Sequence, residues 1–389
     1  MPAGSTDEAR ETRLAQAEQV WRDDPDLAPE TLGDEGNSKE DIGCYLTSYY
    51  QRVATEDLAP PDRLAAVAAA HARLGRSRPQ GRALVQVRDP DGAHLDRVGP
   101  SSLVVDIVVD DMPFLVDSVT TELNRHSAEI TLLVHPLLRV RRDVTGALRA
   151  IIGVCGDDEH DHEAVPADEL TESWIHVELG PPRDRVTATS LAADLRRVLD
   201  DVRVAVEDQP RMGSAAVVLA TALAADPDDD AAEAGELLRW LAKGNFTFLG
   251  YREYDLVRTG AGAGLRPVPG TGLGILRHDR QGEATLRTLS PQVIARTQDS
   301  DERLVLAKAN SRSTVYRPNY LDYVSVKKLD AAGTVTGEFR FLGLYTHAAH
   351  TAPIAGVPVL RRKLAQVLAA AGLSRDSHDG KDLLEILED

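Results

Sequence analysis

An apolar run over residues 102–109 is the feature that most constrains the fold. Such a run is typical of a central strand that is covered on at least one face. It ends at Asp110 and Asp111, and Pro113 follows almost at once. Apolar residues then recur at the spacing of one helical face as far as residue 124. A buried strand that leads through two acids into an amphipathic helix is therefore the first expected unit.

The neighbouring segments complete a small antiparallel sheet. The expected elements are a strand over 82–88, a long strand over 129–142, its hairpin partner over 147–154, a strand over 174–179 and a helix over 189–206. Two helices, over 42–53 and 62–75, precede them. This order of elements predicts an α+β sandwich with helices on one face of the sheet.

A second unit is expected to begin after Pro210. Its expected elements are helices over 214–225 and 230–242, strands over 246–257, 273–277, 284–289, 304–309, 321–329 and 338–345, and terminal helices over 352–373 and from 382. Tight turns between the strands favour an antiparallel sheet with flanking helices. The whole chain is therefore expected to be α+β.

The two ends of the chain differ in character. Residues 1–40 are polar, acidic and rich in Gly, Pro and Asp, which is typical of a loosely docked arm. At the other end, four apolar residues form a stripe that nothing downstream covers: Leu383, Leu384, Ile386 and Leu387. We expect the natural chain to continue past Asp389, or another subunit to cover the stripe.

Charge and composition exclude some partners. Lys and Arg number 44 against 62 Asp and Glu, a net charge of −18. Nucleic acids and anionic membranes need a basic face, so neither is an expected partner. The N-terminus has no apolar core of the signal-peptide kind, and Cys44 and Cys155 lie far apart without metal-ligand spacing. We therefore expect a cytoplasmic protein with reduced cysteines.

The acids before the first helix have two interpretations. In the structural one, Asp111 is the N-cap and Pro113 lies in the first turn, where its missing N–H is not needed. In the functional one, the mouth of the helix binds an amino-acid effector, whose carboxylate takes free N–H groups. The candidate effector-binding residues are Asp110, Asp111, Met112, Asp117 and Ser118. The structural interpretation is favoured, because Pro113 removes one donor.

Motifs for metal or cofactor chemistry are weak. The loop at 155–164 carries His160 and His162 among several acids, but a single run without separated ligand pairs favours a solvated loop. No nucleophile elbow, paired-cysteine metal motif or dinucleotide fingerprint occurs. We therefore expect no metal, no catalytic residue and no cofactor-binding residue in this chain.

Several long strings resemble one family. They are DDMPFLVDSV at 110–119, ESWIHVELG at 172–180, LLRWLAKGNFTFLGYREYDL at 237–256, SVKKLDAAGTVTGEFRFLGLYT at 325–346 and DSHDGKDLLEILED at 376–389. In these strings the chain resembles the N-terminal region of the large bacterial NAD-specific glutamate dehydrogenases. The strings are distinctive and spread over nearly the whole chain.

The resemblance implies an organisation and a role. Residues 41–208 correspond to an ACT-like (ferredoxin-like) domain with leading helices, residues 212–350 to a PAS-like domain, and residues 352–389 to helices that lead toward a next domain. The full family protein is longer, and oxidises L-glutamate with NAD to 2-oxoglutarate and ammonium in amino-acid catabolism. Its catalytic domain lies C-terminal to this region. The implied partners are other domains of the same enzyme, further subunits and an amino-acid effector.

Three departures from the family pattern matter. No strand is predicted after the helix at 189–206, so the strand at 82–88 is the candidate for the missing sheet edge. Phe114 stands where ligand-binding ACT domains often carry glycine. The lysine and aspartate residues of glutamate dehydrogenase chemistry have no counterpart. The expected function is thus allosteric regulation and assembly without catalysis, and the alternative is an autonomous amino-acid-sensing ACT-type module.

Overall fold

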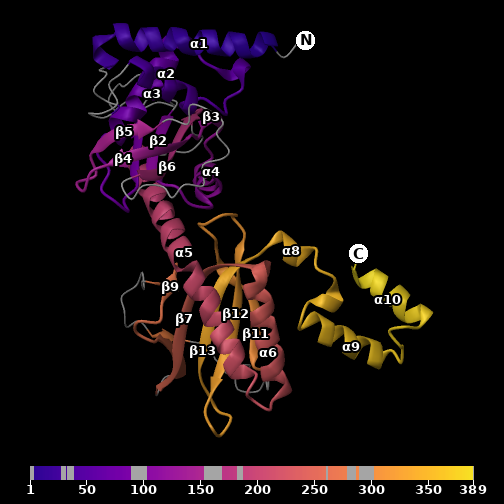
Figure 1. Ribbon diagram of the computed structural model, residues 1–389. Coiled ribbons are helices and arrows are strands. Elements are labelled where there is room, and N and C mark those ends of the chain that lie inside the picture. The colour runs from indigo at the N-terminus through magenta and orange to yellow at the C-terminus, as the bar shows by residue number, and fades with distance from the viewer. Residues whose placement is uncertain are drawn as a thin grey trace. The chain divides into compact units, whose positions relative to one another are not determined.

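The computed structural model shows two compact units, Met1–Asp200 and Asp201–Asp389 (Figure 1). The structure describes residues 4–27, 32, 39–88, 103–152, 169–181, 187–259, 262–277, 286–288 and 302–388. Each unit combines helices with one antiparallel sheet, which confirms the expected α+β class. Within these ranges, no helix is both long enough and apolar enough to span a bilayer.

The first unit contains six strands that follow three helices, with two more helices among and after the strands. In chain order the main elements are α1 (Gly4–Asp23), α2 (Lys39–Tyr49), α3 (Pro61–Gly75), β1 (Leu84–Arg88), β2 (Leu103–Asp110), α4 (Leu115–Arg125), β3 (Ile130–Val134), β4 (Leu137–Arg142), β5 (Leu148–Ile152), β6 (Glu169–Leu179) and the start of α5 (Ala188–Leu223). All six strands belong to one sheet.

The strand expected from the apolar run lies inside the sheet. The strand order is β1-β2-β6-β4-β5, and β3 also pairs with β6. Every residue of β2 except Asp110 is buried. The short strand expected over 82–88 is confirmed as the sheet edge, because β1 pairs antiparallel with β2 alone.

The long strand expected over 129–142 is instead two strands. β3 pairs with the C-terminal half of β6 and β4 with its N-terminal half, so β6 spans both. The break falls at His135 and Pro136. Pro136 has no N–H for the ladder, although its carbonyl oxygen still accepts from the N–H of Trp174 at 3.1 Å. A single proline thus divides one predicted strand.

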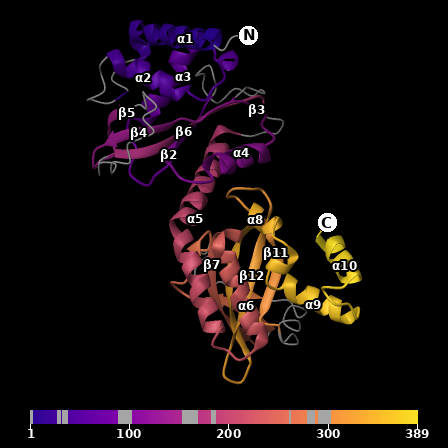
Figure 2. The ribbon, with the colours of Figure 1, turned by 45° about the vertical axis from the view of Figure 1, so that its right-hand side comes forward.

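Helices cover both faces of this sheet, so the expectation of helices on one face is wrong. α1, α2 and α3 lie on one side and α4 on the other (Figure 2). The first three helices share one apolar core with residues such as Val108 and Trp174 of the sheet. On the other side, α5 reaches the sheet edge, where the Arg196 side chain donates to the carbonyl oxygen of Val85 at 2.7 Å.

Residues 4–23 form a packed helix rather than the loosely docked arm expected from composition. Ala17 and Trp21 of α1 are fully buried, and Leu14 is 6 % exposed. Arg10 and Arg13 fix the helix further by donating to carbonyl oxygens of residues 50–58. Three apolar residues at helical spacing are enough to bury one side of a polar helix, and average composition does not report this.

Two further expectations are corrected in the helices. α5 continues without a break from Ala188 to Leu223 and carries Pro210 inside it, so the two helices expected over 189–206 and 214–225 are one helix. A proline removes one main-chain hydrogen bond, which a long packed helix tolerates at the cost of local bending.

Cys44 in α2 is disulfide-bonded, so the expected reduced state is wrong for this residue.

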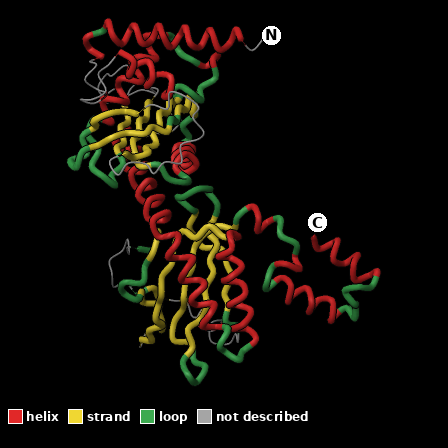
Figure 3. Tube along the Cα trace, viewed as in Figure 1, coloured by secondary structure: helices red, strands yellow, loops and turns green. Residues whose placement is uncertain are grey.

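The second unit is a seven-stranded antiparallel sheet with the second half of α5 and α6 packed on it (Figure 3). Its elements are α6 (Asp229–Trp240), β7 (Phe246–Thr259), β8 (Gly262–Pro267), β9 (Leu273–Gly274), β10 (Arg287–Thr288), β11 (Leu304–Arg312), β12 (Tyr320–Leu329), β13 (Val335–Tyr345), α8 (His347–His350), α9 (Leu360–Ala370) and α10 (His378–Glu388). The strand order is β10-β8-β7-β13-β12-β11, with β9 on β7. The core between helices and sheet contains Met212, Leu238, Phe248 and Phe341.

Candidate functional site

The mouth of α4 is built differently from the expected N-cap at Asp111. Phe114 is the N-cap, with φ 74° and ψ 0°, and its side chain makes no capping hydrogen bond. Asp111 follows the last residue of β2 and is still bonded to the sheet, because its N–H donates to the carbonyl oxygen of Thr171 at 3.0 Å. Its carboxylate accepts from the hydroxyl of Ser173 at 2.6 Å. The prediction that Asp111 caps the helix is therefore wrong, since strand pairing extends one residue further than the apolar run indicated.

The five candidate effector residues do not converge on one opening. Asp110 accepts from the buried guanidinium of Arg78 at 2.5 Å, and the buried hydroxyl of Ser118 donates to the carbonyl oxygen of Phe114 at 2.6 Å. Asp117 is exposed and Met112 half-buried. Of the three carboxylates, only those of Asp111 and Asp117 belong to exposed residues.

The left-handed backbone of Phe114 leads to a stability prediction. A residue with a Cβ atom is strained at positive φ, whereas glycine is not. We expect Phe114→Gly to be more stable than Phe114→Ala by about 1 kcal/mol in urea unfolding, because both lose the ring and differ only in backbone strain. At Val116, inside the helix, the order should reverse by about the same amount. Equal stability of the two Phe114 variants would contradict this account.

A buried ion cluster stands behind the mouth of α4, made of Arg78, Asp110, Arg142 and Glu172. Arg78 and Glu172 are 0 % exposed and Arg142 is 8 % exposed. Glu172 accepts from Nε of Arg78 at 2.8 Å, and from Nε and Nη2 of Arg142 at 2.6 and 2.8 Å. The indole N–H of Trp174 adds a bond of 2.9 Å. Two cations face two anions, so the charges of the cluster are balanced and its carboxylates accept from its guanidinium groups.

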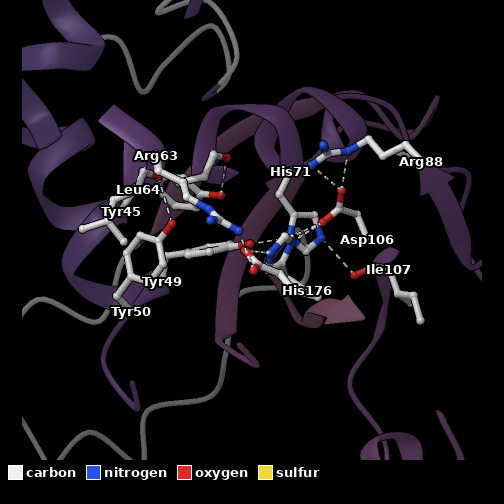
Figure 4. A network of polar contacts seen from close by, with 12 residues as sticks. Tyr45, Tyr49, Tyr50, Arg63, Leu64, His71, Arg88, Asp106, Ile107 and His176 are labelled. Atoms are coloured by element: carbon white, nitrogen blue, oxygen red, sulfur yellow. Dashed lines mark hydrogen bonds and ion pairs between the residues drawn. The ribbon is translucent and has the colours of Figure 1, made fainter. Parts of the chain in front are cut away.

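A second buried polar network crosses the same sheet (Figure 4). His71 of α3 lies between Tyr49 and the sheet: its Nδ1 is 2.7 Å from the hydroxyl of Tyr49, and its Nε2 is 3.1 Å from the carbonyl oxygen of Ile107. The carbonyl oxygen only accepts, so Nε2 carries the proton and Nδ1 accepts from Tyr49. Burial lowers the pKa of His71 to about 4. The neutral imidazole is thus the form that this site holds.

Asp106 and His176 form the charged half of this network. Nδ1 of His176 lies 2.6 Å from Oδ1 of Asp106, and both residues are fully buried. Burial alone would raise the pKa of Asp106, but the hydrogen bond from His176 and the nearby cationic groups lower it to about 2. Burial alone would lower the pKa of His176, but Asp106 and Glu178 outweigh it and raise the value. Glu178 also accepts from Arg63 at 2.6 Å.

One hydrogen-bonded chain leads out of the sheet beside the break at Pro136. Ser173 donates to Asp111, so its oxygen must accept from Nε2 of His135, which lies 3.0 Å away. Burial lowers the pKa of His135, although Asp111 opposes the shift. His135 is therefore neutral with its proton on Nε2, and its Nδ1 keeps a lone pair that no described residue uses.

One cluster in the first unit has ligand types that suit a metal ion. Glu122, His126 and Asp194 bring one ligand atom each within 4.8 Å of one another. However, Arg125 and Arg197 lie 2.8 and 3.4 Å from the Glu122 oxygens. Two arginines balance the two carboxylates, which indicates an ionic contact between α4 and α5. The loop at 155–164 lies outside the described residues.

Sequence reasoning found Asp110 and Asp111 but not their partners. Arg78 and Glu172 are separated by 94 positions, and no local pattern joins them. His71, Asp106 and His176 were also missed, although a charged residue inside an apolar run was a usable signal for Asp106. A charge in a buried strand requires a partner.

Comparison with known proteins identifies similar sequences. Residues 45–195 match the family model described as glutamate dehydrogenase, ACT1 domain, and residues 357–389 match the one described as glutamate dehydrogenase, helical motif 1. The first match runs from α2 into α5 and contains all the described strands of the first unit.

Three relatives carry the name NAD-specific glutamate dehydrogenase. The protein of Halomonas elongata is 35 % identical over 289 residues, 72 % of this chain and 17 % of the relative. That of Pseudomonas aeruginosa is 32 % identical over 322 residues, 81 % of this chain and 19 % of the relative. That of Mycobacterium tuberculosis is 31 % identical over 339 residues, 83 % of this chain and 18 % of the relative. The chain thus spans less than a fifth of the length of these relatives.

Proposed function

Because the chain is an N-terminal region of the NAD-specific glutamate dehydrogenase family, we propose that it regulates and assembles a longer enzyme. That enzyme converts L-glutamate and NAD into 2-oxoglutarate, ammonium and NADH in the cytoplasm. The observation that carries this proposal is the ACT1 match over residues 45–195, which covers the sheet of the first unit. The ionisable residues of that sheet mostly bond one another, as expected of a rigid scaffold.

The second unit supports a companion role. We assign residues 212–350 to a PAS-like domain, on the basis of an antiparallel sheet with α6 and part of α5 packed on it. Residues 352–389 then lead toward a neighbouring domain or a second subunit. Ile386 of α10 is 71 % exposed, as expected of a helix that another surface covers. These surfaces would hold the catalytic part of the enzyme in a homo-oligomer.

The direct test is to measure whether the chain alone catalyses the reaction. We expect the purified chain, supplied with L-glutamate and NAD, to form no NADH above the rate without protein. The matched measurement uses the longer natural enzyme under the same conditions, where NADH should accumulate. Far-UV circular dichroism controls for folding of the chain. Glutamate-dependent turnover by the chain alone would contradict the proposal.

The second candidate is an autonomous amino-acid sensor, which the exposed acids at the mouth of α4 favour. In that case an amino acid binds near Asp111 and Asp117, with its ammonium on a carboxylate. Asp117→Asn would then weaken binding to the isolated chain. Light scattering separates this role from assembly, because a sensor can remain monomeric at every concentration, whereas an assembly region should self-associate or bind the remainder of the enzyme.

A further inference from the structure

A polar cavity of about 170 Å³ lies in the first unit, beside the break between β3 and β4. One wall is the end of α2 and the turn after it, residues 48, 49 and 51–53, and the other is residues 133–137. The break explains the opening, because Pro136 interrupts the ladder at the point where α2 ends. None of the five candidates at the mouth of α4 lines it.

Ser48 supplies a polar group that no described residue satisfies. It is 6 % exposed, and its hydroxyl has no hydrogen-bond partner among the described residues. A buried hydroxyl without a partner is unfavourable, and native proteins usually avoid it. Because Ser48 lines the cavity, a ligand there can satisfy the hydroxyl without any change of the fold.

Arg52 and His135 supply complementary groups on the same cavity. The guanidinium of Arg52 forms no hydrogen bond or ion pair within the described part of the chain, and Arg52 is exposed. It can therefore give two donors to a carboxylate without leaving a partner behind. His135 offers the opposite character, because its proton is used on Ser173 and Nδ1 is left as an acceptor.

We propose that this cavity binds a small α-amino acid, with its carboxylate on Arg52 and Ser48 and its ammonium on Nδ1 of His135. The proposal rests on and deepens the regulatory role proposed above, and it places the effector in this cavity rather than at the mouth of α4. The volume supports a small ligand, since pockets for drug-sized molecules occupy roughly 300–1,000 Å³. The ligand would also connect to the sheet interior, because Tyr49 lines the cavity and bonds His71.

Calorimetry on the purified chain tests the proposal. The probes are glycine, L-alanine, L-serine, L-aspartate and L-glutamate, each titrated alone. We expect at least one to give saturable heat. Its analogue without the amino group, such as propionate for L-alanine, should bind about tenfold more weakly or not at all, and so should the analogue without the carboxylate, such as ethylamine.

Variants locate the site. Arg52→Gln should weaken binding by roughly 10–100-fold, as loss of a charge-assisted contact does, and Ser48→Ala should weaken it by a smaller factor. Arg258→Gln, at an exposed arginine of β7, is the matched control and should change nothing. Arg52 is exposed, so its variant should fold, which the thermal midpoint checks.

Two outcomes would overturn the proposal. One is the absence of saturable heat with all five probes. The other is an amino acid that binds equally well to the natural chain, to Arg52→Gln and to Ser48→Ala. If Asp117→Asn then abolished this binding, the ligand would lie at the mouth of α4. Neither outcome bears on assembly or on catalytic silence, so failure of the cavity and failure of the regulatory region can be told apart.

Discussion

Glu172→Ala is expected to lower the free energy of unfolding of the first unit by about 3–5 kcal/mol, because it leaves buried arginines without their counter-ion. Arg78 is 0 % exposed and Arg142 8 % exposed, and both donate to this carboxylate. Asp110 alone cannot balance two guanidinium groups. Urea unfolding followed by circular dichroism and tryptophan fluorescence measures the loss, and Trp174 beside Glu172 reports locally.

The control is an ion pair near the surface of the same unit. Glu18 of α1 accepts from Arg22, and both side chains are partly exposed. Glu18→Ala should change the free energy of unfolding by less than about 1 kcal/mol, since solvent screens such pairs. Comparable losses in the two variants would show that the buried ion cluster does not hold the sheet together as described.

Acid is expected to destabilise the first unit through His71. In the folded chain the pKa of His71 is lowered from 6.5 to about 4, so between these values the unfolded chain binds a proton that the folded chain does not. The stabilising contribution is complete above pH 6.5 and is lost as the pH falls toward 4. The shift corresponds to roughly 3 kcal/mol. Urea unfolding at a series of pH values measures it.

Asp106 and His176 do not produce this slope. The raised pKa of His176 keeps that ring protonated across the window, and Asp106 titrates lower, at about 2. His71→Gln should therefore flatten the pH dependence between 6.5 and 4, whatever it does to absolute stability. His378→Gln, at an exposed histidine, should leave the dependence in place. An unchanged slope in His71→Gln would refute the assignment.

The expectations that held rest on side chains a few residues apart. The strand before Asp110, the helix that follows it and the hairpin around Gly146 all occur close to their expected positions. The edge strand β1 was also found, because a short alternating run needs only one partner. Element ends were less certain, as Asp111 shows, because pairing with another strand extends an element beyond its apolar run.

The amino-acid sequence by itself determined the α+β class, most of the strands and the helix that follows Asp110. These features depend on the spacing of apolar residues and on turn-forming residues, which act between near neighbours in the sequence. Only the tertiary structure decided that α1 is packed, that Pro136 opens a cavity and that Glu172 lies between Arg78 and Arg142. Those features depend on sheet register and on which helix covers which face. The fold brings together residues that are far apart in the sequence, such as Arg78 and Glu172, which are 94 positions apart. The free energy of burying a charge depends on the partner that lies beside it in the folded chain.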